Sequence, residues 1–221
     1  GVDYFDFYLM HAQNRTNFEK YKACRAYETA LELKNEGKIR HLGISFHDTA
    51  DVLDNILTEY PQIEAVQLQF NYADYEDEEV QARKCLEVCQ KHGKPVIVME
   101  PVKGGSLVNL PDDAATILDD LGDGSHASYA IRFAASFEGI MMVLSGMGNM
   151  QMLEDNVRVA SDPDPLTPDE LAAVDELEQK LNELKKVYCT GCAYCVTDCP
   201  MNIPIPRYFS LYNADKHRKG Y

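Results

Sequence analysis

The residues with the clearest chemical character lie near the C-terminus, where four of the seven cysteines fall within eleven residues. They are Cys189, Cys192, Cys195 and Cys199, followed by Pro200, in the spacing C-x2-C-x2-C-x3-C-P. Three thiolates spaced three residues apart on a tight turn can converge on one iron–sulfur cube, and Gly191 lets the backbone fold closely around it. The run therefore predicts a ferredoxin-type [4Fe–4S] site.

Two other interpretations of the cysteine run are weaker. Zinc sites usually hold two C-x2-C pairs well apart or combine cysteine with histidine, and disulfides between such close neighbours are strained. In two-cluster ferredoxins the cysteine before the proline serves the other cluster, so Cys199 is expected to lead away from the cube. Cys24, Cys85 and Cys89 are the remaining thiols, and the spacing of Cys85 and Cys89 on one apolar helix face favours buried packing.

Length and composition limit the classes of protein to which the chain can belong. Its 221 residues have room for one sizeable domain and a small appendage. The formal charge of −15 repels phosphate backbones, which argues against a nucleic-acid partner. No apolar run approaches the ~20 residues of a membrane span, and no export signal opens the chain. Free cysteines in a cluster motif then predict the reducing cytoplasm, with no membrane association.

A second group of candidate residues depends on elements that alternate regularly along the chain. Apolar or β-branched runs predict strands at 2–10, 39–45, 65–72, 95–100 and 139–145. Amphipathic stretches between and after them predict helices at 16–37, from 48 onwards, at 76–92, around 127–135 and at 151–160. Five repeats of strand and helix indicate a parallel sheet with crossover helices.

Polar residues gather where these predicted strands end. They are His11, Ser45, Gln67, Asn71, Glu100 and Ser145. In a (β/α)8 barrel this rim carries the active site. A doubly wound open sheet is the alternative, but no G-x-G-x-x-G opens a first βα unit. Taken by itself, His11 is more often a structural rim histidine than a catalytic one.

The composition changes after Ala160, where a Ser-Asp-Pro-Asp-Pro segment reads as a linker. Thr167-Pro-Asp-Glu170 is a capping box that predicts a helix start. The apolar stripe of that helix comprises Leu171, Val174, Leu177, Leu181 and Leu184. The expected division is a barrel part at 1–160, a linker and packing helix at 161–186, and an iron–sulfur segment at 187–221.

Several motifs together resemble a known family. They are Tyr8-Leu-Met-His11, Gly43-Ile-Ser-Phe-His47, Val66-Gln-Leu-Gln-Phe-Asn-Tyr72, Met99-Glu-Pro-Val-Lys-Gly-Gly-Ser-Leu107 and Leu144-Ser-Gly-Met147. These stretches resemble strands four to eight of an aldo/keto reductase, and the tail from Cys189 to Pro206 resembles the ferredoxin-type extension of one branch of that family. The resemblance implies an α/β fold: part of a (β/α)8 TIM-type barrel, then a helix and a small ferredoxin-like iron–sulfur segment.

The resemblance also implies a site that binds NAD(P)H across the rim and reduces a small carbonyl substrate. His11 would match the active-site histidine that hydrogen-bonds the carbonyl oxygen. Ser45 and Gln67 would hold the nicotinamide carboxamide, and Met99 stands where many relatives stack an aromatic ring. The remaining implied cofactor residues are Gly104 and Gly105 near the pyrophosphate, and Ser145, Gly146, Met147, Asp155 and Asn156 around the adenosine end.

Two departures from the family pattern limit this expectation: the chain begins at the family's fourth strand, and the second cysteine run that this branch usually carries after the first does not occur before Tyr221. The family's catalytic aspartate, tyrosine and lysine lie on its first three strands, so the chain resembles the middle of a longer protein, expected to be inactive alone and prone to edge pairing. Three hypotheses for the function follow. The first is a carbonyl reductase with an iron–sulfur module and a possible redox partner. The others are a non-catalytic electron-transfer protein that uses the barrel as a scaffold, and an inactive partial product. Because no basic residue lies between Ser145 and Asn156, we expect weak discrimination or a preference for NADH.

Overall fold

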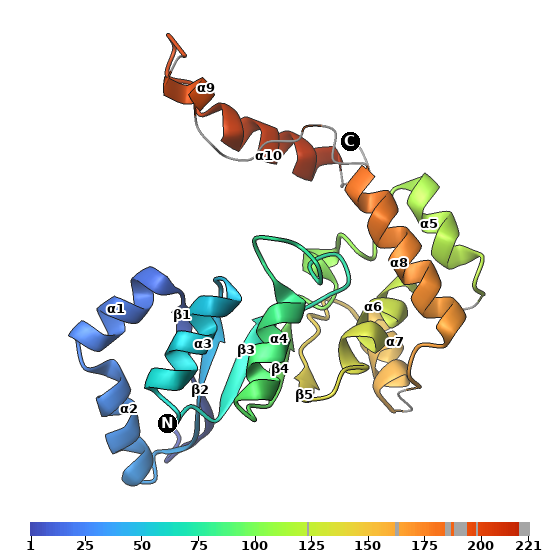
Figure 1. The fold of residues 1–221 in the computed structure, drawn as a ribbon. Helices are drawn as coiled ribbons and strands as arrows, with labels where there is room; N and C mark the ends of the chain where they lie inside the picture. The colour runs from blue at the N-terminus through green and yellow to red at the C-terminus, as the bar shows by residue number, and fades with distance from the viewer. Residues whose placement is uncertain (123, 162–163, 184–186, 188–193, 198, 217–221) are drawn as a thin grey trace. The chain divides into compact units, whose positions relative to one another are not determined.

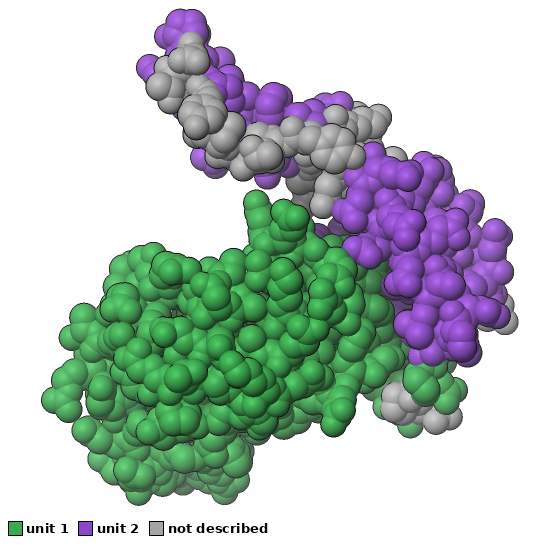
Figure 2. Space-filling model, in the orientation of Figure 1, with its two compact units in different colours: residues 1–101, 130–165 green, residues 102–129, 166–221 purple. Residues whose placement is uncertain are grey.

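The computed structural model describes residues 1–221 except 123, 162–163, 184–186, 188–193, 198 and 217–221. The chain forms two compact units, which Figure 2 colours separately. Unit 1 comprises residues 1–101 and 130–165, and unit 2 comprises residues 102–129 and 166–221. Along the described stretches, every helix is too short or too polar to cross a membrane.

Unit 1 is built on a parallel sheet whose strands follow one another in sequence order (Figure 1). Among the described residues the strands are β1 Phe5–Gln13, β2 Ile39–Phe46, β3 Ala65–Gln69, β4 Val96–Met99 and β5 Ile140–Val143. A doubly wound sheet reverses its strand order at a switch point, whereas a barrel wall does not. The unbroken order therefore favours the barrel-type arrangement and confirms the predicted strand–helix alternation.

Helices α1 to α4 run along the sheet (Figure 1). Their bounds are α1 Arg15–Ala23, α2 Ala26–Asn35, α3 Ala50–Glu59 and α4 Ala82–Lys91. The single helix predicted at 16–37 is wrong, because Arg25 takes a left-handed φ of 58° and divides it in two. The helix also begins earlier than the capping box at Thr16 suggested, since the Asn14 side chain accepts a hydrogen bond from Asn17 N at 2.8 Å.

The register of the strands separates the sheet into two faces. One row aligns Ile44, Val66 and Val96, all fully buried, and the next aligns Phe46, Leu68 and Val98. This is the face on which the helices pack, and its apolar side chains form the core of unit 1. Near the two edges of the sheet large apolar side chains are exposed, with Phe5 of β1 at 54% and Met142 of β5 at 47%. β1 and β5 are the edge strands of this sheet, and pairing of such edges with another chain stays a prediction.

The remaining elements of unit 1 are α7 Met150–Ser161 and most of α6 His126–Ala135. Unit 2 contains a short 3-10 helix at Lys103–Gly105, then α5 Asp112–Asp119, α8 Pro168–Glu183, α9 Tyr194–Thr197 and α10 Ile205–Lys216. Helices α5 and α8 pack together. The predicted capping box of α8 is confirmed, because Thr167 N donates to Glu170 Oε2 at 2.7 Å and Glu170 N donates to Thr167 Oγ1 at 3.3 Å.

Candidate active site at the carboxyl ends of the strands

Four of the predicted site residues lie at the same edge of the sheet, because parallel strands all end there. Ser45 in β2 and Gln67 in β3 are direct register partners. Met99 ends β4, opposite Gln69. His11 lies near the end of β1, and the backbone N–H of its neighbour Ala12 donates to Ser45 Oγ at 2.8 Å. The structure therefore brings the predicted carbonyl-binding and carboxamide-binding residues onto adjoining strands.

The residues predicted to bind the pyrophosphate and the adenosine end of the nucleotide lie on different segments of the chain. Ser145 follows β5, and its Oγ accepts a hydrogen bond from Asn156 Nδ2 of α7 at 2.9 Å. Gly146 and Met147 follow Ser145 in the same exposed connection. Gly104 and Gly105 belong to the 3-10 helix of unit 2, where both have positive φ angles of 60° and 91°. Such angles favour glycine, so this turn depends on both residues.

The end of β1 has an irregular backbone that the sequence does not reveal. Met10 pairs with Ile44 and Gln13 with Phe46, so two residues of β1 face one of β2, as in a β-bulge. Ala12, in this bulge, has a left-handed φ of 50°. A non-glycine residue in that conformation costs about 1–2 kcal/mol.

Replacing Ala12 with glycine tests this strain directly. The relief of the left-handed conformation offsets the greater freedom of glycine in the unfolded chain, so Ala12→Gly is expected to leave the free energy of unfolding within about 0.5 kcal/mol or to raise it. The control is Ala30→Gly, in the interior of α2, which should lose about 1 kcal/mol or more. Urea unfolding of both variants is the measurement, and an equal loss would contradict strain at Ala12.

A buried polar network organises the ends of β3 and β4. Asp74 is 1% exposed, and its Oδ2 accepts from Gln69 Nε2 at 2.8 Å and from Asn71 Nδ2 at 2.7 Å. Asn71 Nδ2 also donates to Glu100 O at 3.0 Å, where Glu100 has a left-handed φ of 57°. Sequence reasoning named Asn71 as a rim residue but missed Asp74, because nothing in a Tyr-Ala-Asp-Tyr stretch signals a buried carboxylate.

The donors and acceptors at the strand ends suit a carboxamide. A serine hydroxyl carries one donor and two acceptor positions. Since Ser45 Oγ accepts from Ala12 N, its own hydrogen is left to donate elsewhere. Gln67 is half-buried, and within the described residues its amide makes no hydrogen bond. A hydroxyl donor beside an open glutamine amide can bind both the oxygen and the nitrogen of a nicotinamide carboxamide, so the residues present fit the implied cofactor.

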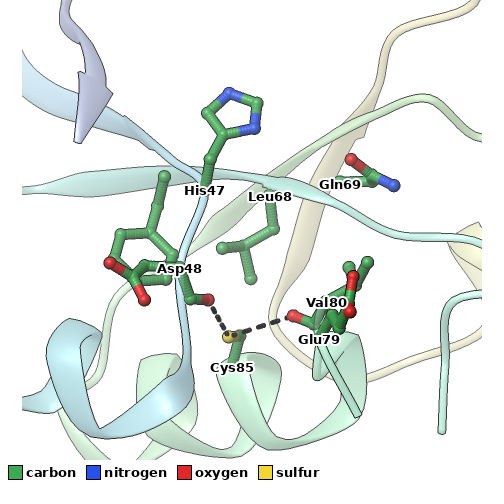
Figure 3. Close-up of a pocket in the computed structure, with 8 residues that line it drawn as sticks. His47, Asp48, Leu68, Gln69, Glu79, Val80 and Cys85 are labelled. Atoms are coloured by element: carbon green, nitrogen blue, oxygen red, sulfur yellow. Dashed lines mark hydrogen bonds between the residues drawn. The ribbon is translucent and has the colours of Figure 1, made fainter. Parts of the chain in front are cut away.

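A small cavity of about 170 Å³ lies on the helix side of β2 and β3 (Figure 3). Its lining residues are Phe46, His47, Asp48, Leu68, Gln69, Glu79, Val80 and Cys85. Phe46 and Leu68 belong to the helix-packed face of the sheet, and a dinucleotide does not fit this volume. The cavity is therefore distinct from the carboxamide position. His47 is one of its lining residues; burial lowers the pKa of this histidine, and the charge of His11 lowers it further.

Cys85 lines this cavity, but its thiol should react slowly with alkylating reagents. Its Sγ lies 3.9 Å from Asp48 O and from Val80 O, and burial raises the pKa of its thiol to about 12. At pH 8 its thiolate fraction is on the order of a thousandfold below that of an ordinary thiol. Iodoacetamide at pH 8 is expected to leave Cys85 unmodified while exposed Cys24 reacts, as measured by peptide mass spectrometry. Labelling of both at similar rates would contradict this.

The predicted iron–sulfur ligands lie only partly within the described chain. Cys189 and Cys192 fall outside the described residues, whereas Cys195 is an exposed free thiol in α9 and Cys199 a half-buried one. Where the structure describes the chain, no group of three His, Cys, Asp or Glu residues could hold a metal ion. Cys85 and Cys89 are both buried on α4, which confirms their predicted packing role.

The strand order and the polar residues at the strand ends are those of a βα-barrel protein. The chain belongs to the aldo/keto reductase family, whose model matches residues 1–179. No curated protein matches the chain.

Three solved structures have the same fold at low sequence identity. The aldo-keto reductase from Bacillus halodurans in its holo form is 24% identical, with a TM-score of 0.60 over 80% of this chain and 62% of that one. An aldo-keto reductase from Klebsiella pneumoniae in complex with NADPH is 20% identical, with a TM-score of 0.60 over 80% and 60%. A thermostable aldo-keto reductase with the inhibitor epalrestat is 21% identical, with a TM-score of 0.62 over 80% and 61%. The chain thus spans about three fifths of these relatives, 60–62% of their length.

Proposed function

We propose that the chain is part of an NAD(P)H-dependent oxidoreductase that reduces a small carbonyl compound. The observation that carries the proposal is the donor hydroxyl of Ser45 beside the open amide of Gln67, one strand from His11. Membership of the aldo/keto reductase family and the NADPH bound to the Klebsiella pneumoniae relative support it.

Each strand end has its own part in this function. The dinucleotide, when bound, supplies the hydride. Ser45 and Gln67 hold its carboxamide, Met99 packs against the nicotinamide ring, and His11 donates a hydrogen bond to the substrate carbonyl oxygen. The proposal assigns the pyrophosphate to Gly104 and Gly105, and the adenosine end to Ser145, Gly146, Met147 and Asn156.

The C-terminal segment 187–221 is proposed to add an iron–sulfur module to the barrel part at 1–160, with 161–186 as linker and packing helix. Cys189, Cys192 and Cys195 would hold three corners of a [4Fe–4S] cube, while Cys199 follows a separate path. Such a cluster passes single electrons to a redox partner. Its support is the cysteine spacing.

Nucleotide binding by the 221-residue chain tests the proposal. Titration with NADH and with NADPH, followed by nicotinamide fluorescence, is expected to show saturable binding with similar affinity for both. Gln67→Leu should weaken binding about tenfold, because it leaves the carboxamide with one hydrogen-bonding side chain fewer.

The matched control is Gln62→Leu, which removes an exposed glutamine ahead of the other end of β3 and should leave the affinity unchanged. Absence of saturable binding of either nucleotide would contradict the proposed function for this chain. Binding of NADPH far tighter than NADH would contradict only the expected weak discrimination.

A further inference from the structure

We propose that Tyr21 and Ser45 are positioning residues that fix the orientation of His11, and that Ser45 couples this orientation to the nicotinamide carboxamide. The proposal rests on the function proposed above. Its starting point is the bulge at the end of β1, where Ala12 holds a left-handed φ of 50° immediately after His11. Bulges beside active sites re-aim the side chains they carry.

Side chains from α1 and β2 hold the backbone that follows His11, beginning with the peptide that links it to Ala12. Tyr21 of α1 donates its hydroxyl hydrogen to His11 O at 3.1 Å. The N–H of the same peptide is held as well, because Ala12 N donates to Ser45 Oγ at 2.8 Å. Asn17 Nδ2 then donates to Ala12 O at 2.8 Å. An unfavourable conformation persists only where its surroundings determine it this fully, and such conformations cluster at functional sites.

The same contacts set where the His11 ring points. Backbone φ and ψ fix the direction of the Cα–Cβ bond and restrict the side-chain rotamers. His11 is exposed, so packing around its ring does little to orient it. The hydrogen bonds on the His11–Ala12 peptide therefore restrain it: those with Tyr21 and Ser45, and a longer one from Gln13 Nε2 to His11 O at 3.4 Å.

Ser45 connects this restraint to cofactor binding through a single hydroxyl. Ser45 is 5% exposed, and its Oγ accepts a hydrogen bond from Ala12 N. No residue in the described part of the chain accepts its hydrogen, which leaves that hydrogen for a ligand acceptor. A carboxamide oxygen bound there polarises the hydroxyl and strengthens the hydrogen bond from Ala12 N. Binding of the nicotinamide end thus tightens the backbone that presents His11.

Nuclear magnetic resonance of the 221-residue chain tests both parts of the proposal. The His11 ring signal is assigned by its disappearance in His11→Gln, and amide hydrogen exchange reports on Ala12. In Ser45→Ala the Ala12 amide should exchange about fivefold faster, as expected for one lost hydrogen bond. In both Ser45→Ala and Tyr21→Phe the His11 signal should shift and broaden as the ring samples more rotamers.

The control is Tyr8→Phe, which removes a tyrosine hydroxyl from β1 that makes no hydrogen bond among the described residues, and which should leave the His11 signal unchanged. If Ser45→Ala does not fold, Tyr21→Phe decides, because it removes one hydroxyl and leaves the ring. An unchanged His11 signal in the folded variants would overturn the positioning role.

Addition of NADPH to the wild-type chain separates this proposal from the function on which it rests. We expect a further slowing of Ala12 exchange and a shift of the His11 signal, and neither in Ser45→Ala. Nucleotide binding without any change at Ala12 or His11 would overturn the coupling. If the wild-type chain binds no NADPH, the proposed function fails and the coupling fails with it, while the signals of the free variants still decide the positioning role.

Discussion

Replacement of Cys192 by alanine is expected to abolish the proposed iron–sulfur centre, which we expect to form in the wild-type chain on anaerobic reconstitution with iron and sulfide. Cys192 is the middle of the three thiolates with the spacing that converges on one cube. Loss of a central ligand leaves two neighbours six residues apart, which is too few to retain the cluster. Visible absorption and iron content per chain are the measurements, and the wild-type value should not exceed one cluster.

The Cys199→Ala chain should lose much less of its cluster content, because the ferredoxin pattern directs the thiol before the proline to a different cluster. Cys24→Ala is the matched control, since it removes an exposed thiol of unit 1. Equal loss in Cys192→Ala and Cys199→Ala would show that all four cysteines surround one cube. Two stable clusters per chain would contradict the proposed ligand set.

A valine at position 43 is expected to destabilise unit 1 by about 3 kcal/mol, although valine favours strands. Gly43 of β2 lies between Leu9 of β1 and Ala65 of β3. A Cβ atom there would come within 2.5 Å of Leu9 Cδ2 and 2.8 Å of Ala65 O. The leucine can move, but the carbonyl oxygen belongs to the sheet backbone. Strands β2 and β3 must therefore move apart at the Gly43–Ala65 pair, which lies two residues before the pair of Ser45 and Gln67.

Urea unfolding followed by circular dichroism measures this loss. Gly148→Ala is the control, because a Cβ atom there meets nothing within 4 Å and its backbone has an ordinary φ. That variant should unfold like the wild type. A Gly43→Val chain as stable as Gly148→Ala would show that the β2 backbone shifts freely, and that strand spacing does not limit this site.

The sequence by itself determined the class of fold and the chain positions of the candidate site. Short apolar or β-branched runs separated by amphipathic stretches predict parallel strands with crossover helices, because strands of this composition must be covered on both faces. Parallel strands end at one edge, so polar residues at their ends, such as His11, Ser45 and Gln67, are brought together by topology alone. The motifs of the same strand ends were enough to indicate the family.

Local patterns determined much less about where elements break. The predicted helix at 16–37 has continuous helical periodicity, yet Arg25 interrupts it with a left-handed backbone. Asn14, and not the predicted box at Thr16, caps helix α1 for a similar reason. The bulge in β1 sets where the chain leaves the strand and therefore where the helix begins. Propensity is a weak influence, and the path of the chain around the sheet overrides it.

Only the tertiary structure decided how the site residues are held. Ala12 is left-handed because Tyr21, Ser45 and Asn17 bond the peptides around it, and these partners come from two elements up to 33 residues away. Asp74 is buried because amides from β3 and its following loop converge on it. Hydrogen bonds between distant segments leave no periodic trace in a sequence, since they depend on the three-dimensional meeting of individual side chains with backbone groups.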